Sequence, residues 1–234
     1  MKISVIIPVF NEEKTISTII KKIKNLKNLD IELIVIDDCS TDKTRKLIDD
    51  NNISSLIDKK IFLKSNFGKG FACRKGIEAA TGDLILIQDA DLEYDPNDYY
   101  KLINPFKDEN IKVVYGSRVL PGSKKIVPKS LLFKFTAIAN FFLTKLSNLL
   151  NNQKLTDAHT CYKVFKSEVI KKINLIENGF CFCPEVTAKI SKEKIIIHEI
   201  PINYIARTYK EGKKISFKDG ILSFYAIIRY NIFG

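Results

Sequence analysis

Residues 3–12 read ISVIIPVFNE. The apolar run stops at Pro8, and polar side chains follow at Asn11 and Glu12. An uncharged run of this length is typical of a buried β-strand. Residues 12–29 follow, and their apolar side chains recur at the spacing of an amphipathic helix, namely Ile16, Ile19, Ile20, Ile23 and Leu26. The opening of the chain therefore predicts a strand that leads into a helix.

The same alternation recurs through the first 88 residues. Strands are predicted at residues 32–36, 61–64 and 84–88, and helices at residues 41–51 and 69–81. Strands that alternate with helices form a mostly parallel sheet with helices on both faces. We therefore expect a Rossmann-like α/β fold with flanking helices.

Acidic and polar side chains follow each of the four predicted strands, at residues 10–12, 37–42, 66–70 and 89–91. Because the carboxyl ends of parallel strands lie at one edge of a sheet, these segments are expected to converge on one pocket. Crowded carboxylates repel one another unless a cation or hydrogen-bond donors compensate them. The edge thus predicts a divalent metal and a ligand that carries N–H or hydroxyl groups.

Helix capping is the alternative explanation for these acids. It accounts for Asp42 and Asp95, which precede predicted helical turns. It accounts poorly for the adjacent pair Asp37 and Asp38, or for the acids at residues 89–91, because one helix end does not need two carboxylates.

Charge is unevenly distributed along the 234 residues. Residues 1–118 contain 19 Lys or Arg and 19 Asp or Glu, whereas residues 119–234 contain 19 and 8. The net charge of +11 therefore belongs to the second half. This favours an anionic partner such as a phosphate-bearing lipid, an anionic membrane surface or nucleic acid. A solvated lysine-rich surface is the alternative that composition leaves open.

The cysteines and residues 1–10 indicate the cellular compartment in which the protein is expected. Five cysteines are odd in number and too sparse for a disulfide framework, and residues 1–10 do not resemble a secretory signal. We therefore expect a cytoplasmic protein.

The second half contains a predicted strand at residues 113–117, a basic loop at 120–129 and two apolar helical stretches at 131–150 and 221–233. Polar residues interrupt the first helix every few positions, so it falls short of a membrane-spanning segment. Either helix could lie in a membrane interface or pack as an ordinary amphipathic core helix, and the sequence leaves both open.

Seven blocks of the chain together resemble glycosyltransferase family 2. They are PVFNE (8–12), IDDCSTD (36–42), NFGKG (66–70), QDADLE (88–93), GSR (116–118), TDAHTCYK (156–163) and RTYKEGKKI (207–215). Within this family the chain is similar to dolichol-phosphate mannosyltransferases and related polyprenyl-phosphate glycosyltransferases. The resemblance implies a GT-A fold, a nucleotide-sugar donor, a divalent metal and inversion at the anomeric carbon.

The resemblance also implies a domain organisation. We expect a single GT-A domain over residues 1–234, with a nucleotide-sugar-binding half at 1–118 and an acceptor-facing and membrane-facing half at 119–234. The second half would carry the C-terminal amphipathic helices.

Roles for individual residues follow from the same resemblance. Asp89 and Asp91 match the family's metal-binding pair, whose Mg²⁺ or Mn²⁺ bridges the donor diphosphate. Arg118, Arg207 and Lys213 match basic residues around the diphosphate and the acceptor phosphate. The expected catalytic residues are Asp91, Arg118, Asp157, Arg207 and Lys213. The expected nucleotide-sugar contacts are Pro8, Phe10, Glu12, Ile36, Asp37, Asp38, Lys69, Asp89, Ala90 and Asp91, with Asp37 or Asp38 bonding the base.

Two residues depart from the family's pattern. Cys39 stands where Gly is common, and Glu93 stands where Gln or Ser is common. Glu93 could add a metal contact or alter the sugar preference.

The chemical nature of the acceptor determines whether sugar transfer needs a general base. A polyprenyl phosphate is already ionised near neutral pH, because its second pKa is about 6. Transfer to a saccharide hydroxyl would need a general base, and Asp157 is the candidate, with a purely structural role as its alternative. We expect transfer from a nucleotide diphosphate sugar, such as GDP-mannose or UDP-glucose, to a polyprenyl phosphate by a peripheral protein at the cytoplasmic membrane face.

Other functions fit less well. A nucleic-acid-binding module would interleave aromatic and basic residues, whereas the aromatics here lie largely in apolar runs. We therefore expect no nucleic-acid partner. A zinc site from His159, Cys161, Cys181 and Cys183 is a weaker hypothesis, because Cys-x-Cys does not match the usual ligand spacing.

Overall fold

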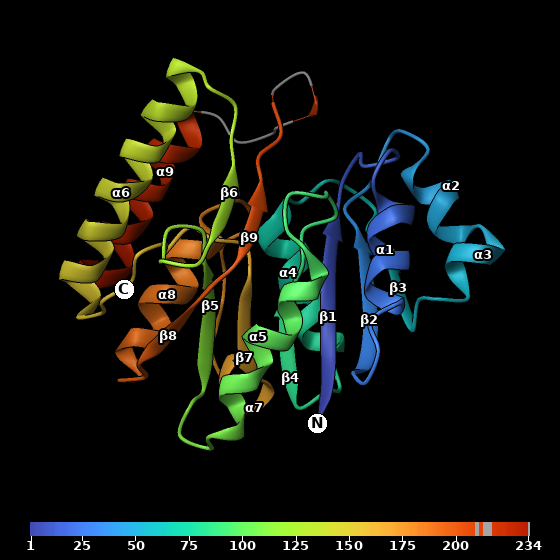
Figure 1. Ribbon diagram of the computed structural model, residues 1–234, viewed down its shortest axis with the longest axis horizontal. Helices are drawn as coiled ribbons and strands as arrows, with labels where there is room; N and C mark the ends of the chain where they lie inside the picture. The colour runs from blue at the N-terminus through green and yellow to red at the C-terminus, as the bar shows by residue number, and fades with distance from the viewer. Residues whose placement is uncertain (209–210, 213–216, 234) are drawn as a thin grey trace.

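A seven-stranded sheet forms the centre of the computed structural model, which describes residues 1–208, 211–212 and 217–233 (Figure 1). In the order β3-β2-β1-β4-β7-β5-β8, its strands are β3 (Lys59–Phe62), β2 (Asp30–Asp37), β1 (Lys2–Val9), β4 (Leu84–Ile87), β7 (Lys163–Lys166), β5 (Val113–Ser117) and β8 (Ile197–Pro201). β1 is parallel to β2 and β4, β2 is parallel to β3, and β5 is parallel to β8. The predicted mostly parallel α/β fold is confirmed.

The strand β7 is antiparallel to both of its neighbours, β4 and β5. It comes from the second half of the chain, so both halves contribute to one sheet. No strand was predicted there, because four residues give too short a pattern and their partners lie far away in the sequence. Two further short strands, β6 (Lys124–Ile126) and β9 (Asn203–Ile205), form a separate parallel ribbon. β6 lies within the predicted basic loop at residues 120–129, and no element was predicted for residues 203–205.

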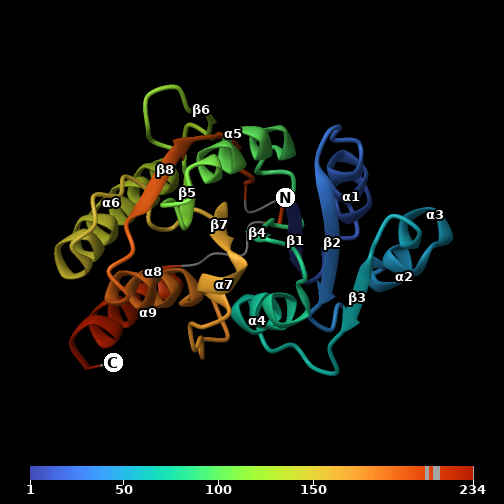
Figure 2. The same cartoon turned by 90° about the horizontal axis from the view of Figure 1, so that it is seen from below.

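Helices cover both faces of the sheet. In Figure 2, α1 and α5 lie on one face, and α4 and α8 lie on the other. The helices around the sheet are α1 (Ile16–Lys24), α2 (Thr44–Asp49), α3 (Asn51–Ser54), α4 (Lys69–Ala79), α5 (Tyr99–Ile103), α7 (Ser167–Ile170) and α8 (Phe182–Lys192), with 3₁₀ turns η1 (Pro96–Asp98) and η2 (Asn104–Lys107). Two longer helices, α6 (Leu131–Asn151) and α9 (Phe217–Ile228), lie side by side at the β8 end of the molecule, and a π-helical turn, η4 (Arg229–Phe233), follows α9 (Figure 1).

Two predicted helices differ from the observed ones. The helix predicted at residues 12–29 begins only at Ile16, because residues 12–15 form a turn in which the Thr15 N–H donates to the Glu12 carbonyl. The helix predicted at residues 41–51 is split into α2 and α3 at Asp50, whose φ of −59° and ψ of 132° are extended. Asp50 then accepts a hydrogen bond from the Asn52 N–H and caps α3.

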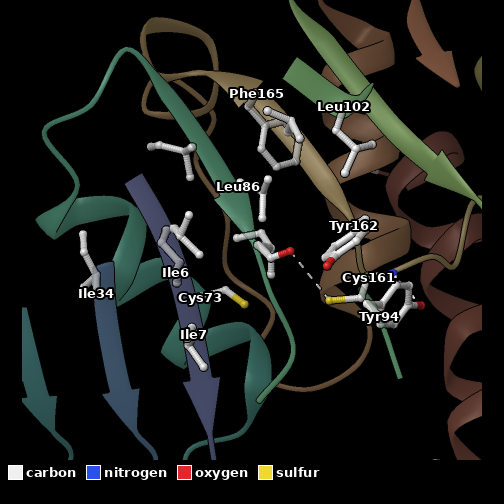
Figure 3. Packing of buried hydrophobic residues seen from close by; sticks show 14 of the residues in the cluster. Ile6, Ile7, Ile34, Cys73, Leu86, Tyr94, Leu102, Cys161, Tyr162 and Phe165 are labelled. Carbon is white, nitrogen blue, oxygen red and sulfur yellow. Dashed lines mark hydrogen bonds between the residues drawn. The ribbon is translucent and has the colours of Figure 1, made fainter. Parts of the chain in front are cut away.

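The core forms where apolar strand residues meet the helices on each face. Ile6 and Ile7 of β1, Ile34 of β2 and Leu86 of β4 are fully buried (Figure 3). Burial of one such side chain contributes about 1.5 to 3 kcal/mol. These three strands are therefore held firmly, and the loops that follow them start from fixed positions.

A buried carboxylate ties β2 to this core. Glu32 accepts hydrogen bonds from the Ser4 hydroxyl (2.5 Å) and from the Thr81 N–H and hydroxyl (2.8 Å each), and Lys59 lies 2.9 Å away. Burial would raise the pKa of Glu32, but these bonds outweigh it and lower the pKa from 4.5 to about 2. The charged form is therefore favoured by folding.

We expect Glu32→Gln to lower the free energy of unfolding near neutral pH by about 3 kcal/mol, because the amide cannot replace a charged acceptor of these bonds. The wild-type contribution is present above pH 4.5 and is lost as the pH falls toward 2, because the folded-state pKa is the lower one. Urea unfolding of both proteins between neutral pH and about pH 3 measures this. A constant difference between the two across this range would contradict the assignment.

Candidate active site

A cavity of about 890 Å³ opens at the carboxyl edge of β1, β2 and β4. Residues from all four predicted strand ends line it, including Phe10, Asp38, Lys69 and Asp91. From there the cavity extends to residues of α6 and α9. The predicted convergence of the strand ends on one pocket is confirmed.

Most of the expected nucleotide-sugar residues lie in the cavity wall. These are Pro8, Phe10, Glu12, Asp38, Lys69, Asp89, Ala90 and Asp91. Ile36 and Asp37 do not line it. Ile36 is fully buried in β2, and Asp37 pairs with Arg45 at 2.9 Å and accepts a hydrogen bond from the Ser40 N–H. Of the two adjacent acids after β2, Asp38 is the one that faces the cavity.

Asp38 holds the loop that begins α4. Its two carboxylate oxygens accept hydrogen bonds from the Phe67 N–H (2.8 Å) and the Gly68 N–H (2.7 Å). Burial raises the pKa of Asp38 by more than these bonds lower it. The neighbouring Cys39 has a φ of 62°, so this turn places a non-glycine residue in the left-handed region that favours glycine. The loop between β2 and α2 is therefore closely tied to the loop before α4.

Four carboxylates and two cations meet at the end of β4. Lys69 Nζ lies 2.5 Å from Asp89, and the Arg207 guanidinium lies 2.6 Å from Asp91 and 3.0 Å from Glu12. Glu93, a departure from the family's pattern, accepts hydrogen bonds from the Arg207 N–H (2.7 Å) and the Tyr204 hydroxyl (2.9 Å). Glu93 thus fixes the segment that carries Arg207 over the acids.

The two acids of the Asp-Ala-Asp block differ in their electrostatics. Burial, Asp89 and Glu93 raise the pKa of Asp91 to about 7, although Arg207 opposes them. For Asp89, burial also raises the pKa, but Lys69 outweighs it and the pKa lies below its ordinary value. Negative charge on Asp91 is therefore under-compensated by the protein, and additional positive charge would stabilise it.

Arg118 and Asp157 form a buried bidentate ion pair. Arg118 Nε lies 2.7 Å from Asp157 Oδ2, Arg118 Nη2 lies 2.8 Å from Oδ1, and the Arg118 N–H also donates to Oδ2. Burial would raise the pKa of Asp157, but Arg118 outweighs it and keeps that pKa below its ordinary value. Arg118 lines the cavity, whereas Asp157 lies behind it.

The segment after Asp157 is held by a buried lysine. Lys163 is 1% exposed, donates hydrogen bonds to the Ala158 and Thr160 carbonyls, and lies 4.1 Å from the centre of the Tyr115 ring. His159 of this segment lines the cavity, and burial together with nearby Lys163 lowers its pKa to about 4. The imidazole is therefore neutral at pH 7.

Of the expected catalytic residues, Lys213 lies outside the described residues.

The donor set at the cavity suits a hard divalent cation that also binds a ligand. Among the described residues, no three His, Cys, Asp or Glu side chains are arranged to hold a metal ion, so His159, Cys161, Cys181 and Cys183 do not form a zinc site. Asp89 and Asp91 supply two carboxylates. Mg²⁺ commonly binds through one or two carboxylates together with substrate phosphates rather than in a complete protein cage. The two acids fit that arrangement.

Several residues of the cavity wall had no individual prediction. They include Lys125, Lys129, Lys134, Asn140, Leu143, Phe180 and Ser223. The predicted basic loop at residues 120–129 and the apolar helices at 131–150 and 221–233 indicated the regions from which most of these residues come. Which side chains face the strand ends depends on how α6 and α9 pack, and helical spacing alone does not determine this.

Comparisons with known proteins bear on the family of this chain. The model of Glycosyl transferase family 2 matches residues 4–174. A dolichol-phosphate mannosyltransferase from Pyrococcus furiosus is 27% identical over 91% of this chain, which spans 59% of that protein's length. A UDP-N-acetylglucosamine--dolichyl-phosphate N-acetylglucosaminyltransferase from Methanococcus voltae is 28% identical over 97% of this chain and 94% of its own.

The fold has solved counterparts. The structure of glucosyl-3-phosphoglycerate synthase from Mycobacterium tuberculosis, in complex with Mn²⁺, UDP and glucosyl-3-phosphoglycerate, has a TM-score of 0.70 with this chain. The match covers 98% of this chain and 80% of that one at 18% identity. The central sheet with its flanking helices is a GT-A fold. With the family model matching most of its length, the chain belongs to glycosyl transferase family 2.

Proposed function

We propose that this protein transfers a sugar from a nucleotide diphosphate sugar to a polyprenyl phosphate at the cytoplasmic face of a membrane, with inversion at the anomeric carbon. One observation carries the proposal. A single cavity joins the acidic strand ends, at Asp89 and Asp91, to the space between α6 and α9, at Leu143 and Ser223. Such a cavity suits a polar donor at one end and an acceptor with an apolar chain at the other.

The donor end is formed mainly by residues 1–118, and the acceptor end mainly by residues 119–234. Asp89 and Asp91 would hold Mg²⁺ or Mn²⁺ together with the donor diphosphate. That cation supplies Lewis-acid stabilisation of the charge that develops on the leaving diphosphate. Arg207 lies within reach of the same charge, because its guanidinium contacts Asp91 and Glu12 at the cavity wall.

Several basic residues line the cavity. They include Arg118, Lys125, Lys129, Lys134 and Arg207. This arrangement suits an acceptor phosphate, whose ionised oxygen attacks the anomeric carbon on the face opposite to the leaving diphosphate. Because the phosphate oxygen is already mostly ionised near pH 7, no protein group has to remove a proton from it.

Asp157 acts in this scheme as a positioning residue. Its two oxygens are engaged by Arg118, and its lowered pKa makes it a weak base. Arg118 reaches the cavity in a fixed orientation because of this pair.

We expect Asp157→Asn to reduce transfer to a polyprenyl phosphate by about tenfold or less, because the amide oxygen still accepts a hydrogen bond from Arg118. A general base would instead give a loss of about 10²- to 10⁴-fold. Initial rates across a range of pH separate the two roles. Loss of the acidic limb of the pH profile, together with a loss in the larger range, would assign Asp157 as the base.

An apolar surface on α6, α9 and η4 supports the membrane location. Its exposed side chains are Leu131, Phe135, Ile138, Phe141, Phe142 and Leu149 on α6, Ile221, Leu222, Phe224 and Tyr225 on α9, and Ile232 and Phe233 on η4. In the described part of the chain, no helix combines the length and apolar character needed to cross a membrane. An exposed apolar face on helices from the basic half suits a protein that lies on an anionic bilayer.

The proposal is tested by incubating the purified protein with Mg²⁺ or Mn²⁺, radiolabelled UDP-sugars and GDP-sugars, and a short polyprenyl phosphate in detergent. Label that moves into the organic phase supports the proposal and names the donor. Metal-dependent nucleotide binding with all label left in water would favour a saccharide hydroxyl as the acceptor. Absence of nucleotide binding would refute the donor assignment.

A further inference from the structure

The loop of residues 174–180, which we call the Glu177 loop, packs directly on the start of α4. A Cβ atom on Gly68 would lie 2.5 Å from the Asn178 carbonyl oxygen, and one on Gly70 would lie 2.5 Å from the Glu177 carbonyl oxygen. The Phe71 N–H donates a hydrogen bond to the Asn178 carbonyl (3.1 Å). Only glycine allows this approach, and Gly68 also has a φ of 99°.

The same stretch of α4 forms part of the donor end of the cavity. The Gly68 N–H donates to Asp38, and the next residue, Lys69, pairs with Asp89. Gly68, Lys69 and Phe180 of the Glu177 loop all line the cavity. The position of the Glu177 loop therefore sets where Lys69 and the Gly68 backbone lie.

On its other side, the Glu177 loop contacts the C-terminal turn. The Tyr230 hydroxyl donates to Glu177 Oε1 (2.6 Å), and Arg229 Nη1 lies 3.6 Å from the same oxygen. Tyr230 is buried in a small apolar cluster with Ala188 of α8 and Ala226 of α9, separate from the main core. Two residues of η4 thus contact the Glu177 loop through the Glu177 carboxylate.

The loop is fixed to α8 as well. Glu185, which is fully buried, accepts hydrogen bonds from the Ile176 N–H (2.7 Å) and the Glu177 N–H (2.9 Å). The backbone of the loop is therefore held from α8 as well as through the Tyr230 contact. What the Tyr230 contact adds is a link between this ordered loop and the helix that carries part of the exposed apolar surface.

We propose that Glu177 is a positioning residue for the donor: its contact with Tyr230 couples the placement of α9 and η4 to the Gly68–Lys69 segment, and so to nucleotide-sugar affinity. This inference rests on the proposed function for the identity of the donor. On η4, Ile232 and Phe233 are 58% and 81% exposed. A membrane surface that binds these two side chains would therefore also affect the hydrogen bond between Tyr230 and Glu177. Donor binding and engagement of the C-terminal helix are thereby linked.

The test compares the affinity of the full chain for UDP and for GDP, each with Mn²⁺ and without lipid, by calorimetry. In Tyr230→Phe the ring keeps its apolar contacts and only the hydroxyl is lost, so the variant should fold. We expect a three- to tenfold weaker affinity in this variant and in Glu177→Ala. Glu177→Gln, which retains an oxygen that accepts the Tyr230 bond, should recover most of the affinity. Tyr225→Phe is the matched control, because Tyr225 on α9 is 61% exposed, and its affinity should equal that of the wild type.

Hydrogen exchange of the Phe71 amide provides a second readout that needs no nucleotide. We expect faster exchange in Tyr230→Phe than in wild type, with an unchanged melting temperature. Wild-type affinity and wild-type Phe71 exchange in Tyr230→Phe would overturn the coupling. If the wild type binds neither nucleotide, the proposed function fails at its donor step, while Phe71 exchange still decides whether the coupling exists.

Discussion

Asp91→Asn is expected to reduce sugar transfer by about 10³-fold, because a neutral amide would bind the proposed divalent cation more weakly, and that cation would stabilise the charge on the leaving diphosphate. The fold should survive the change. Burial and two neighbouring carboxylates disfavour charge on Asp91, and Arg207 keeps Glu12 and Glu93 as partners when Asp91 is neutral. The variant should therefore unfold at the same temperature as the wild type or at a higher one.

Asp49→Asn is the matched control for this experiment. Like Asp91, Asp49 pairs with a basic side chain, in this case Lys60 at 2.7 Å, but it lies outside the cavity and is half exposed. Its loss should leave transfer within about twofold of wild type, since exposed pairs contribute little. Transfer by Asp91→Asn at a rate near that of the control would remove Asp91 from the reaction.

Placing aspartates on the exposed face of α6 should weaken membrane binding strongly without affecting the donor end. Phe135 and Phe142 are 59% and 65% exposed. Transfer of two such rings into a bilayer contributes at least about 2 kcal/mol, and new negative charge is repelled by anionic lipid. We expect Phe135→Asp with Phe142→Asp to weaken binding to vesicles with anionic phospholipid by about 30-fold or more.

Co-sedimentation with vesicles measures this binding, and calorimetry with UDP or GDP checks that the donor end is intact. Ile196→Asp is the control, because Ile196 is 70% exposed but lies outside α6, α9 and η4. Equal vesicle binding by the double variant and the control would refute a membrane role for this face.

The strand ends were predictable because their pattern is local. A buried run such as ISVIIP fixes both a strand and the point where its polar loop begins, and parallel pairing brings such points together. The pattern of residues therefore suffices to place Asp89 and Asp91 at this edge of the sheet. It does not suffice for the strand β7, because the antiparallel pairing of β7 with β4 joins segments about eighty residues apart and leaves no short-range signature.

The partners of the charged residues could not be predicted for a similar reason. The motifs identify Asp157 and Arg118 as important, but only the fold brings them into one bidentate pair and leaves Arg118 alone facing the cavity. Likewise, Asp37 and Asp38 are adjacent and chemically identical. Successive side chains of an extended segment point to opposite faces. Asp37, the last residue of β2, therefore pairs with Arg45, whereas Asp38 accepts a hydrogen bond from the loop before α4.

The proposed acceptor is a lipid phosphate bound at the α6–α9 end of the cavity. With the donor named by the labelled panel, the most direct measurement compares initial transfer rates to a polyprenyl phosphate and to the polyprenol of the same chain length. We predict transfer to the phosphate and no detectable transfer to the alcohol, since the described cavity offers cations for a phosphate and Asp157 is engaged by Arg118. Comparable rates with both acceptors, or label passed only to a saccharide, would contradict the account.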